Sequence, residues 1–419
     1  MKVAEPVYGA AGQLLLRPGV TLTDRYIHFL HKQGLPAVYI EDPDTDDVLA
    51  PQPIRETTRH AAREQLQEVF YFFAPGAKRL RNLSLSLTKK HISTERFAQA
   101  VQSAFGPRAF DGIGRSVDAI IADLLNEDVL VGLNSIKCHD TYTFQHSIDV
   151  TIMGLVLARK AGWPQDRQRT FGIGCLLHDL GKVLIAAHIL NKPETLTAEE
   201  CEQVKAHPLL GYQMIKAVNP DRFTLMAQVA YQHHERQDGK GYPRGLKGTN
   251  RLGHEPGHIH EFGSIAAVAD VYDAMSSTRP YRDAWAPDRV VASIAAAAGD
   301  QLNREAVELF LAAVAPYPKC SEVLLLSGAY SGYTAVVTHV PPQQLNRPVI
   351  RVLHDAKGTR IEPFEIDLRS ELDVQIRSLR TREPEPSSMR HRKSAQVMTP
   401  SATPQLGAGD AVVPAKLAS

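Results

Sequence analysis

Histidine and aspartate side chains in five separate segments are the feature that most constrains how this chain can fold. His233 and His234 stand together before a glycine-rich turn, and His178 and Asp179 end an apolar stretch where Gly181 would stop a helix. Further candidate ligands lie far from these in the sequence, at His146, His207 and Asp270. Side chains that coordinate the same metal must lie close to one another in space. The pattern therefore predicts that these five segments meet at a metal site.

Length, charge and cysteine usage limit the class of protein. The 419 residues suffice for two or three globular domains, and the net charge of +1 gives no support to nucleic-acid binding. The cysteines are widely spaced without a C-x-x-C pair, which predicts reduced cytosolic thiols: Cys138, Cys175, Cys201 and Cys320. No signal peptide opens the chain and no apolar run approaches the ~18 residues of a membrane helix, so we expect a cytoplasmic protein without membrane contact.

Hydrophobic periodicity divides the chain into parts. Short apolar runs and turns predict a small α+β module over 1–50, and amphipathic helical patterns predict a linker or a dimer-forming stalk over 51–110. Helical patterns dominate 111–316, and a period of two predicts a small β domain over 317–377. Residues 378–419 are rich in Pro, Ser and Ala and are predicted to be disordered. The fold class is therefore mainly α, with a small module on either side.

Local signals place most candidate ligands on helices or at helix ends. A helix is expected from Tyr142 to Ala161, and a second from Phe223 through the paired histidines to Glu235. Thr197 and Glu200 form a capping box that opens a helix expected to carry His207. A helix over 264–276 carries Asp270 and Asp273 on one face. Further expected elements are a helix over 113–125, a solvated acidic linker over 41–47, and strands over 323–327, 334–338 and 349–353.

The donor set indicates the chemistry of the site. Imidazole and carboxylate ligands without cysteine suit iron, manganese, magnesium, nickel or zinc. The seven candidates are enough for two ions with one bridging carboxylate, whereas zinc is usually content with three or four. Paired ions about 3.5–4 Å apart clamp an in-line phosphoryl displacement and activate a bridging hydroxide. Lys182, Arg279 and Arg282 follow two of the ligand-bearing segments and would hold phosphate oxygens, so the pattern favours phosphodiester hydrolysis.

Several motifs resemble one known family. The runs LLHDLGK, KP-x-x-LT, AHP-x-x-G, HHERQDGKGYP and ADVYDAMSSTRPYR occur in this order between residues 125 and 316. In order and spacing they resemble the HD-GYP domain, a branch of the HD metal-dependent phosphohydrolases that degrades the bacterial second messenger cyclic di-GMP. The complete set is a far more specific signal than an isolated His-Asp pair.

The resemblance implies a role for each matching residue. One metal would be held by His146, His178, Asp179 and Asp270, and the other by His207, His233 and His234, with Asp179 bridging. Iron or manganese would be the metal. His178, Asp179 and Lys182 would be catalytic, and substrate contacts would come from Lys182, Arg279, Arg282, Asp273 and Asp140. The turn Gly241, Tyr242 and Pro243 would shape the site and contact diguanylate cyclase partners.

Two departures from the family pattern bear on the site. Some members hold a third metal through a glutamate four residues before the first histidine, where this chain has Tyr142, so we expect two metals. The loop over 248–263 looks longer than usual and carries His254, His258 and His260, which as surface-loop histidines are more often neither metal ligands nor substrate contacts.

Three functions follow from these observations. The first is a phosphodiesterase that opens cyclic di-GMP to linear pGpG, or on to GMP. The second is an HD phosphohydrolase for another nucleotide or cyclic dinucleotide, which the pocket residues distinguish poorly. The third is a binding module that senses cyclic di-GMP or docks on cyclases without turnover, although a sensor has no need of a complete set of ligands.

Overall fold

The computed structural model describes residues 1–9, 13–32, 35, 38–49, 53–88, 94–104, 109–125, 142–192, 194–218, 220–253, 255–277 and 284–379. Several predictions fall outside these ranges. They are the substrate contacts Asp140, Arg279 and Arg282, the loop residue His254, the thiol of Cys138 and all but the first two residues of the segment predicted to be disordered, 378–419; Ser378 ends a strand. Cys175, Cys201 and Cys320 are free thiols.

The N-terminal residues form the expected small α+β module. Strands β1 (Val7–Tyr8) and β2 (Leu14–Leu16) pair antiparallel, and helix α1 (Asp24–Lys32) follows. The module has a core of its own, made of Val3, Val7, Leu16, Leu30 and Leu35. Because this core is small, much of α1 lies exposed, with Leu30 its only buried residue.

A helical domain makes up the middle of the chain. Its elements are α2 (Glu56–Thr88), α3 (Thr94–Ala104), α4 (Asp111–Leu124), α5 (Tyr142–Lys160), α6 (Gln165–Leu176), η1 (Leu180–Leu184), α7 (Ala187–Leu190), α8 (Ala198–Lys205), α9 (His207–Val218), α10 (Pro220–Gln232), α11 (Glu261–Ser276), α12 (Pro287–Ala296) and α13 (Arg304–Leu311). The expected capping box of Thr197 and Glu200 opens α8, but α8 ends at Lys205 and His207 begins the next helix, α9. None of the helices in the described ranges combines the length and apolarity needed to cross a bilayer.

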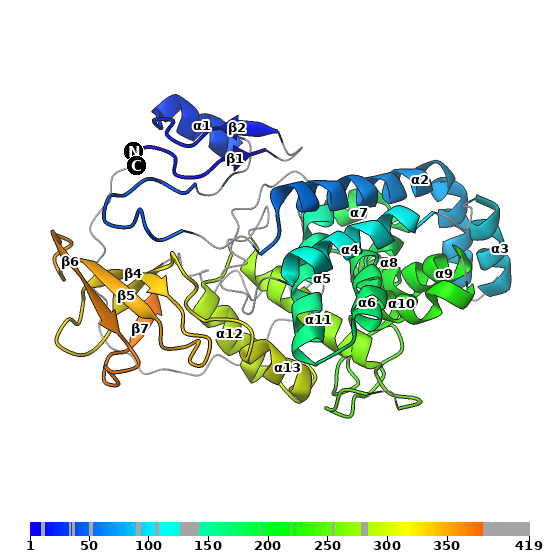
Figure 1. The fold of residues 1–419 in the computed structure, drawn as a ribbon. Coiled ribbons are helices and arrows are strands. Elements are labelled where there is room, and N and C mark those ends of the chain that lie inside the picture. Colours follow the sequence, from blue (N-terminus) through cyan, green and yellow to red (C-terminus); the bar gives the residue numbers. More distant parts are fainter. Residues whose placement is uncertain are drawn as a thin grey trace.

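The segment predicted as a linker or stalk is packed into this domain. A single hydrophobic cluster runs from Ile54 on the approach to α2, through Leu66 and Phe97, to Val314 after α13. In Figure 1, α2 lies along the helical domain above α4 and α5 rather than projecting from it. Amphipathic periodicity shows that a helix buries one face, but it does not reveal which partner covers that face.

The C-terminal part forms one antiparallel sheet. Its strands are β3 (Glu322–Leu325), β4 (Thr334–His339), β5 (Val349–His354), β6 (Arg360–Asp367) and β7 (Ile376–Ser378), in the order β6-β5-β4-β3-β7. The first three match the predicted strands. The sequence analysis did not predict β6, which contains Pro363. A proline weakens the strand signal and is tolerated because β6 lies at the edge of the sheet.

The acidic run over 41–47 binds this sheet. The guanidinium of Arg351 in β5 contacts both carboxylate oxygens of Asp47, at 2.6 and 2.8 Å. In β6, Arg360 Nε lies 2.7 Å from Asp44 Oδ2, and the same arginine pairs with Asp42. The run was predicted to be a solvated linker, and Asp47 is indeed 65% exposed, but the ion pairs also join the run to the sheet. In Figure 1 this blue stretch passes above the orange strands.

Candidate metal centre

Five regions of the helical domain bring the predicted ligands together. His146 lies in α5, His178 and Asp179 follow α6, His207 begins α9, His233 and His234 follow α10, and Asp270 lies in α11. Their nitrogen and oxygen atoms form three overlapping groups, in each of which the ligand atoms lie within 4.8 Å of one another. The groups are His207 with His233 and His234, His146 with His178 and Asp270, and His178 with Asp179 and His233.

This centre has two ends, one formed by His146, His178 and Asp270 and the other by His207, His233 and His234. Asp179 lies between them. Its Oδ2 lies 3.4 Å from His178 Nε2 and 3.8 Å from His146 Nε2. Its Oδ1 lies 3.3 Å from His207 Nε2 and 3.9 Å from His233 Nε2. One fully buried carboxylate therefore reaches histidines of both ends, which is the position that a bridging ligand requires.

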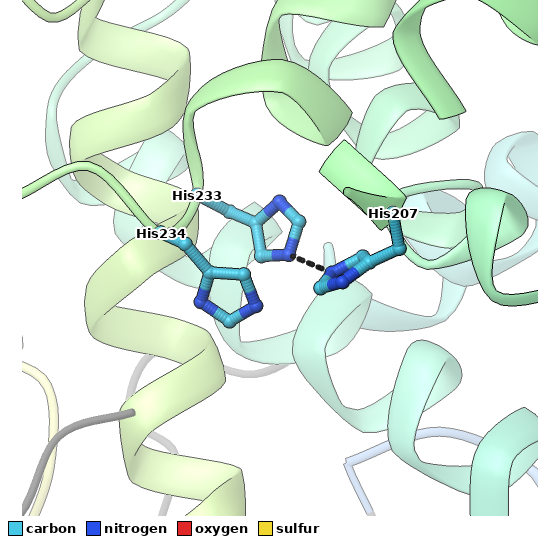
Figure 2. A group of neighbouring side chains, drawn as sticks. All are labelled: His207, His233 and His234. Atoms are coloured by element: carbon cyan, nitrogen blue, oxygen red, sulfur yellow. Dashed lines mark hydrogen bonds between the residues drawn. The ribbon is translucent and has the colours of Figure 1, made fainter. Parts of the chain in front are cut away.

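The hydrogen bonds of His207 and His233 direct their lone pairs toward each other. His207 Nδ1 lies 2.7 Å from the carbonyl oxygen of Val204, and His233 Nδ1 lies 3.0 Å from that of Ala230. A carbonyl oxygen only accepts, so Nδ1 carries the proton in each ring and Nε2 keeps its lone pair. The two Nε2 atoms lie only 3.4 Å apart, along the dashed line of Figure 2. Converging lone pairs in a buried space fit a cation between them.

Buried polar atoms without hydrogen-bond partners point to the same space. Within the described residues they include His178 Nε2, Asp179 Oδ1 and His234 Nδ1. Buried polar groups normally find a partner, because an unpaired one costs about 1–3 kcal/mol. These three atoms lie within one cluster of histidines and aspartates, and a bound metal would give each of them a partner.

Helix ends add to the attraction for a cation. The ligands His178 and Asp179 follow the C-terminus of α6, and His233 and His234 follow the C-terminus of α10. The carbonyl groups left unpaired at a helix C-terminus carry partial negative charge. Two helices therefore present their negative ends beside the centre.

Burial and neighbouring charges hold four of the predicted ligands in metal-binding protonation states. It lowers the pKa of His178 and of His234, and it lowers the pKa of His233 to about 3. Burial alone would raise the pKa of Asp179, but the charges of Lys182 and His178 outweigh it and hold that pKa well below its usual range. Neutral imidazoles and ionised carboxylates are the forms that bind metals.

The sequence of this region matches a known family. The HD domain family matches residues 130–305, the part of the chain that contains all seven predicted ligands. Residues 130–305 are an HD domain. The resemblance predicted from the motifs is thereby confirmed at the level of the HD domain.

Curated relatives of the chain are named phosphodiesterases. The cyclic di-GMP phosphodiesterase PA4108 of Pseudomonas aeruginosa is 33% identical over 263 residues, covering 63% of this chain and 59% of the relative. The cyclic di-GMP phosphodiesterase response regulator RpfG of Xanthomonas campestris is 36% identical over 160 residues, covering 38% of this chain and 40% of the relative. The 3'3'-cGAMP-specific phosphodiesterase 2 of Vibrio cholerae is 29% identical over 202 residues, 48% of this chain and 37% of the relative. The chain thus spans about two fifths to three fifths of the length of these relatives.

The Gly241-Tyr242-Pro243 turn of the HD domain packs against a predicted ligand. The ring of Tyr242 stacks on that of His234, with centroids 4.7 Å apart, and its backbone N–H donates to the His234 carbonyl at 3.1 Å. The peptide bond between Tyr242 and Pro243 is cis. A side chain on Gly241 would meet the backbone of residues 234–236. The tyrosine, predicted as part of a partner motif, therefore faces the metal centre.

Buried Glu235 anchors the rest of this turn. Its two carboxylate oxygens accept the backbone N–H groups of Arg244 and Leu246, each at 2.8 Å. Asp238 similarly accepts the N–H of Lys240 and pairs with Arg236. Both acids therefore hold the backbone of the turn in place.

The remaining predicted residues take varied positions. Lys182 lies at the rim, with its Nζ 2.5 Å from Asp179 Oδ2. Asp273, predicted to contact substrate, instead contacts His146. His260 caps α11 by accepting the Phe262 N–H at 3.1 Å, and half-buried His258 lies 3.8 Å from a carboxylate oxygen of Glu255. Neither lies among the ligand groups of the described residues. Tyr142 begins α5.

Sequence reasoning missed a buried polar network beside His146. Arg59 of α2 contacts Asp149 of α5 at 2.6 Å, and Arg63 contacts Gln145 at 3.0 Å. Gln145 in turn donates to Asp149 at 3.0 Å. The i, i+4 spacing of the two arginines was visible in the sequence, but exposed helix faces carry the same spacing. These contacts tie α2 to the helix that carries His146.

Proposed function

We propose that this chain is a metal-dependent phosphodiesterase that hydrolyses cyclic di-GMP to linear pGpG, or on to GMP. The observation that carries the proposal is the convergence of seven predicted ligands in three overlapping groups with Asp179 between them. Relatives named cyclic di-GMP phosphodiesterases support the choice of substrate.

The donor set supports two divalent ions. His146, His178 and Asp270 would hold one, His207, His233 and His234 the other, and Asp179 would bridge. Iron or manganese suits imidazole and carboxylate donors. Bound ions would supply charge neutralisation for the phosphodiester and a water of lowered pKa.

The residues around the ligands would orient the substrate. Lys182 is partly exposed beside Asp179, so its ammonium group is able to exchange that carboxylate for a phosphate oxygen. We assign Arg279, Arg282 and Asp140 as further substrate contacts on the family pattern. Diguanylate cyclases remain the proposed partners of the turn around Gly241 and Pro243, with Tyr242 turned inward to His234.

Another cyclic dinucleotide is the second candidate substrate. The relative from Vibrio cholerae that covers 48% of this chain is named as specific for 3'3'-cGAMP. Both compounds carry two phosphodiesters in a ring, so a metal centre alone would not distinguish them. Base recognition would decide between them.

Metal-dependent turnover is the test. The full chain, purified without oxygen and loaded with Fe²⁺ or Mn²⁺, is incubated with cyclic di-GMP or 3'3'-cGAMP and the products are separated by chromatography. We expect cyclic di-GMP to be converted to pGpG or GMP, chelator to stop the reaction, and the double variant His178→Ala/Asp179→Ala to be inactive. His188→Ala, which changes an exposed histidine of α7, is the matched control.

Three outcomes would change the proposal. Preferential cleavage of 3'3'-cGAMP would replace the substrate. Tight binding of cyclic di-GMP without turnover under either metal would favour a sensor. Turnover that persists in the double variant would place the activity elsewhere.

A further inference from the structure

We propose that Asp273 is a positioning residue that orients His146 and strengthens it as a ligand, so that the two ends of the metal centre are chemically unequal. The proposal rests on the metal centre of the proposed function and is independent of which cyclic dinucleotide is cleaved. It reassigns a side chain that the sequence pattern predicted to contact substrate.

The geometry of the pair is that of a carboxylate holding an imidazole. Asp273 Oδ2 lies 2.6 Å from His146 Nδ1. The opposite ring nitrogen, Nε2, lies 3.3 Å from Asp270 Oδ1 and so faces the centre. Both aspartates come from α11, three residues apart, and therefore from one face of that helix. Asp270 therefore borders the space for the metal, and Asp273 binds the opposite nitrogen of His146.

Burial and a second hydrogen bond fix the position of the Asp273 side chain. Only 2% of its surface is exposed, and its second oxygen, Oδ1, accepts the hydroxyl of buried Ser277 at 3.0 Å. Both carboxylate oxygens are thus engaged inside the protein. A residue that contacts a soluble dinucleotide would have to present at least one of them to the substrate.

Three other predicted histidine ligands have a backbone carbonyl in that place. The Nδ1 atoms of His178, His207 and His233 lie 2.7–3.0 Å from backbone carbonyls, those of Cys175, Val204 and Ala230. A carbonyl fixes the tautomer but carries no net charge. A carboxylate fixes the tautomer and also raises the basicity of the ligand. The end that contains His146 is therefore richer in negative charge than the end that contains three histidines.

Manganese titration tests this assignment directly. Mn²⁺ binding to the metal-free full chain is followed by electron paramagnetic resonance, which reports free and bound ion without any substrate, and His146→Ala identifies which binding event belongs to that end. We expect Asp273→Asn to weaken that event about tenfold and Asp273→Ala up to about a hundredfold, with the other event unchanged. Ser277→Ala should weaken the same event by less, while Ser276→Ala, its neighbour on α11, should leave both unchanged.

Kinetics with saturating Mn²⁺ distinguish positioning from substrate contact. If Asp273 positions His146, excess metal restores most of the kcat of Asp273→Asn and its KM for cyclic di-GMP stays within twofold of the wild type. A KM raised tenfold or more with both Mn²⁺ events intact would overturn the proposal in favour of substrate contact. Loss of both events in Asp273→Asn and Ser277→Ala alike would also overturn it, since only one end should respond.

The proposed function fails in a distinguishable way. A wild-type chain that binds no Mn²⁺ would refute the metal centre and this assignment together. A chain that binds two ions, responds to Asp273→Asn at one of them and leaves cyclic di-GMP intact would refute only the substrate. Circular dichroism of each variant shows whether the helical domain remains folded.

Discussion

The pKa of His146 is shifted in the opposite direction to those of His178, His233 and His234. Burial alone would lower the pKa of His146, but the hydrogen bonds and charges of Asp270 and Asp273 outweigh burial and raise that pKa from 6.5 to about 9. A metal requires the lone pair that this proton occupies. The metal-free site therefore holds a proton at His146 that competes with the metal.

Proton release on metal binding follows from this competition. The stability that protonated His146 lends to the metal-free protein is fully present below pH 6.5 and is lost as the pH rises through about 9. Binding of Mn²⁺ at pH 7.5 should therefore release about one proton, and affinity should rise up to about tenfold per pH unit until about pH 9. Calorimetry in two buffers of different ionisation enthalpy measures the proton count. An affinity that is independent of pH from 6.5 to 8.5 would contradict the assignment.

At the scale of elements, the Gly241-Tyr242-Pro243 turn follows α10 and packs against the metal centre through Tyr242. Its backbone is held by Glu235 from within and by the N–H of Tyr242, which donates to the His234 carbonyl. Gly241 packs so closely on this backbone that an added Cβ would lie 2.4 Å from the nitrogen of Arg236 and 2.5 Å from the oxygen of His234. This close packing of Gly241 places Tyr242 so that its ring contacts the ring of His234.

Gly241→Ala should displace the turn. The added methyl group meets only backbone, which cannot swing aside, so the turn must move and the contact between Tyr242 and His234 is lost. We expect at least a tenfold weaker binding of Mn²⁺ at the end that contains His207, with the end that contains His146 unaffected. The titration described above measures both.

Gly112→Ala is the control for this variant. Its methyl group would meet only the flexible side chain of Gln65 on α2. Metal affinity should stay at the wild-type value. Equal Mn²⁺ binding by both glycine variants would show that the turn does not support the ligands.

At the scale of the whole molecule, the helices before residue 110 belong to the domain that holds the metal centre. Leu66 of α2 is fully buried in the same cluster as Ile148 of α5, two residues from His146. The pair of Arg59 and Asp149 adds a buried ionic contact between the two helices. A shared core predicts that α2 and the ligand-bearing helices unfold together.

Leu66→Ala tests this shared core. Removing a buried leucine side chain typically costs about 2–5 kcal/mol, so we expect the free energy of unfolding of the helical domain to fall by that amount in a single transition. Tyr71→Ala on the same helix removes a side chain that is 69% exposed and should change it by less than about 0.5 kcal/mol. Calorimetry with and without Mn²⁺ gives both values. Separate melting of α2, with the metal-stabilised transition unshifted, would show that α2 is an independent stalk.

The candidate ligands that the fold brings together could be selected from the sequence alone. Histidines and aspartates in motif order define the donor chemistry, and short-range signals define where helices begin and end. The capping box of Thr197 and Glu200 works within four residues, so no distant contact is needed to form it. The end of α6 follows similarly from local patterns, whereas the helix predicted to run through the paired histidines to Glu235 ends at Gln232, before both histidines.

The tertiary structure alone determines which partner each of these side chains and helices contacts. Whether Asp273 meets substrate or His146, whether Tyr242 points outward or onto His234, and whether α2 projects or packs all depend on segments far apart in the chain. The acidic run over 41–47 has the composition of a solvated linker, and arginines some 300 residues later turn it into a contact. Local sequence limits the conformations of each segment, but burial and pairing are properties of two surfaces, and only the folded chain brings those surfaces together.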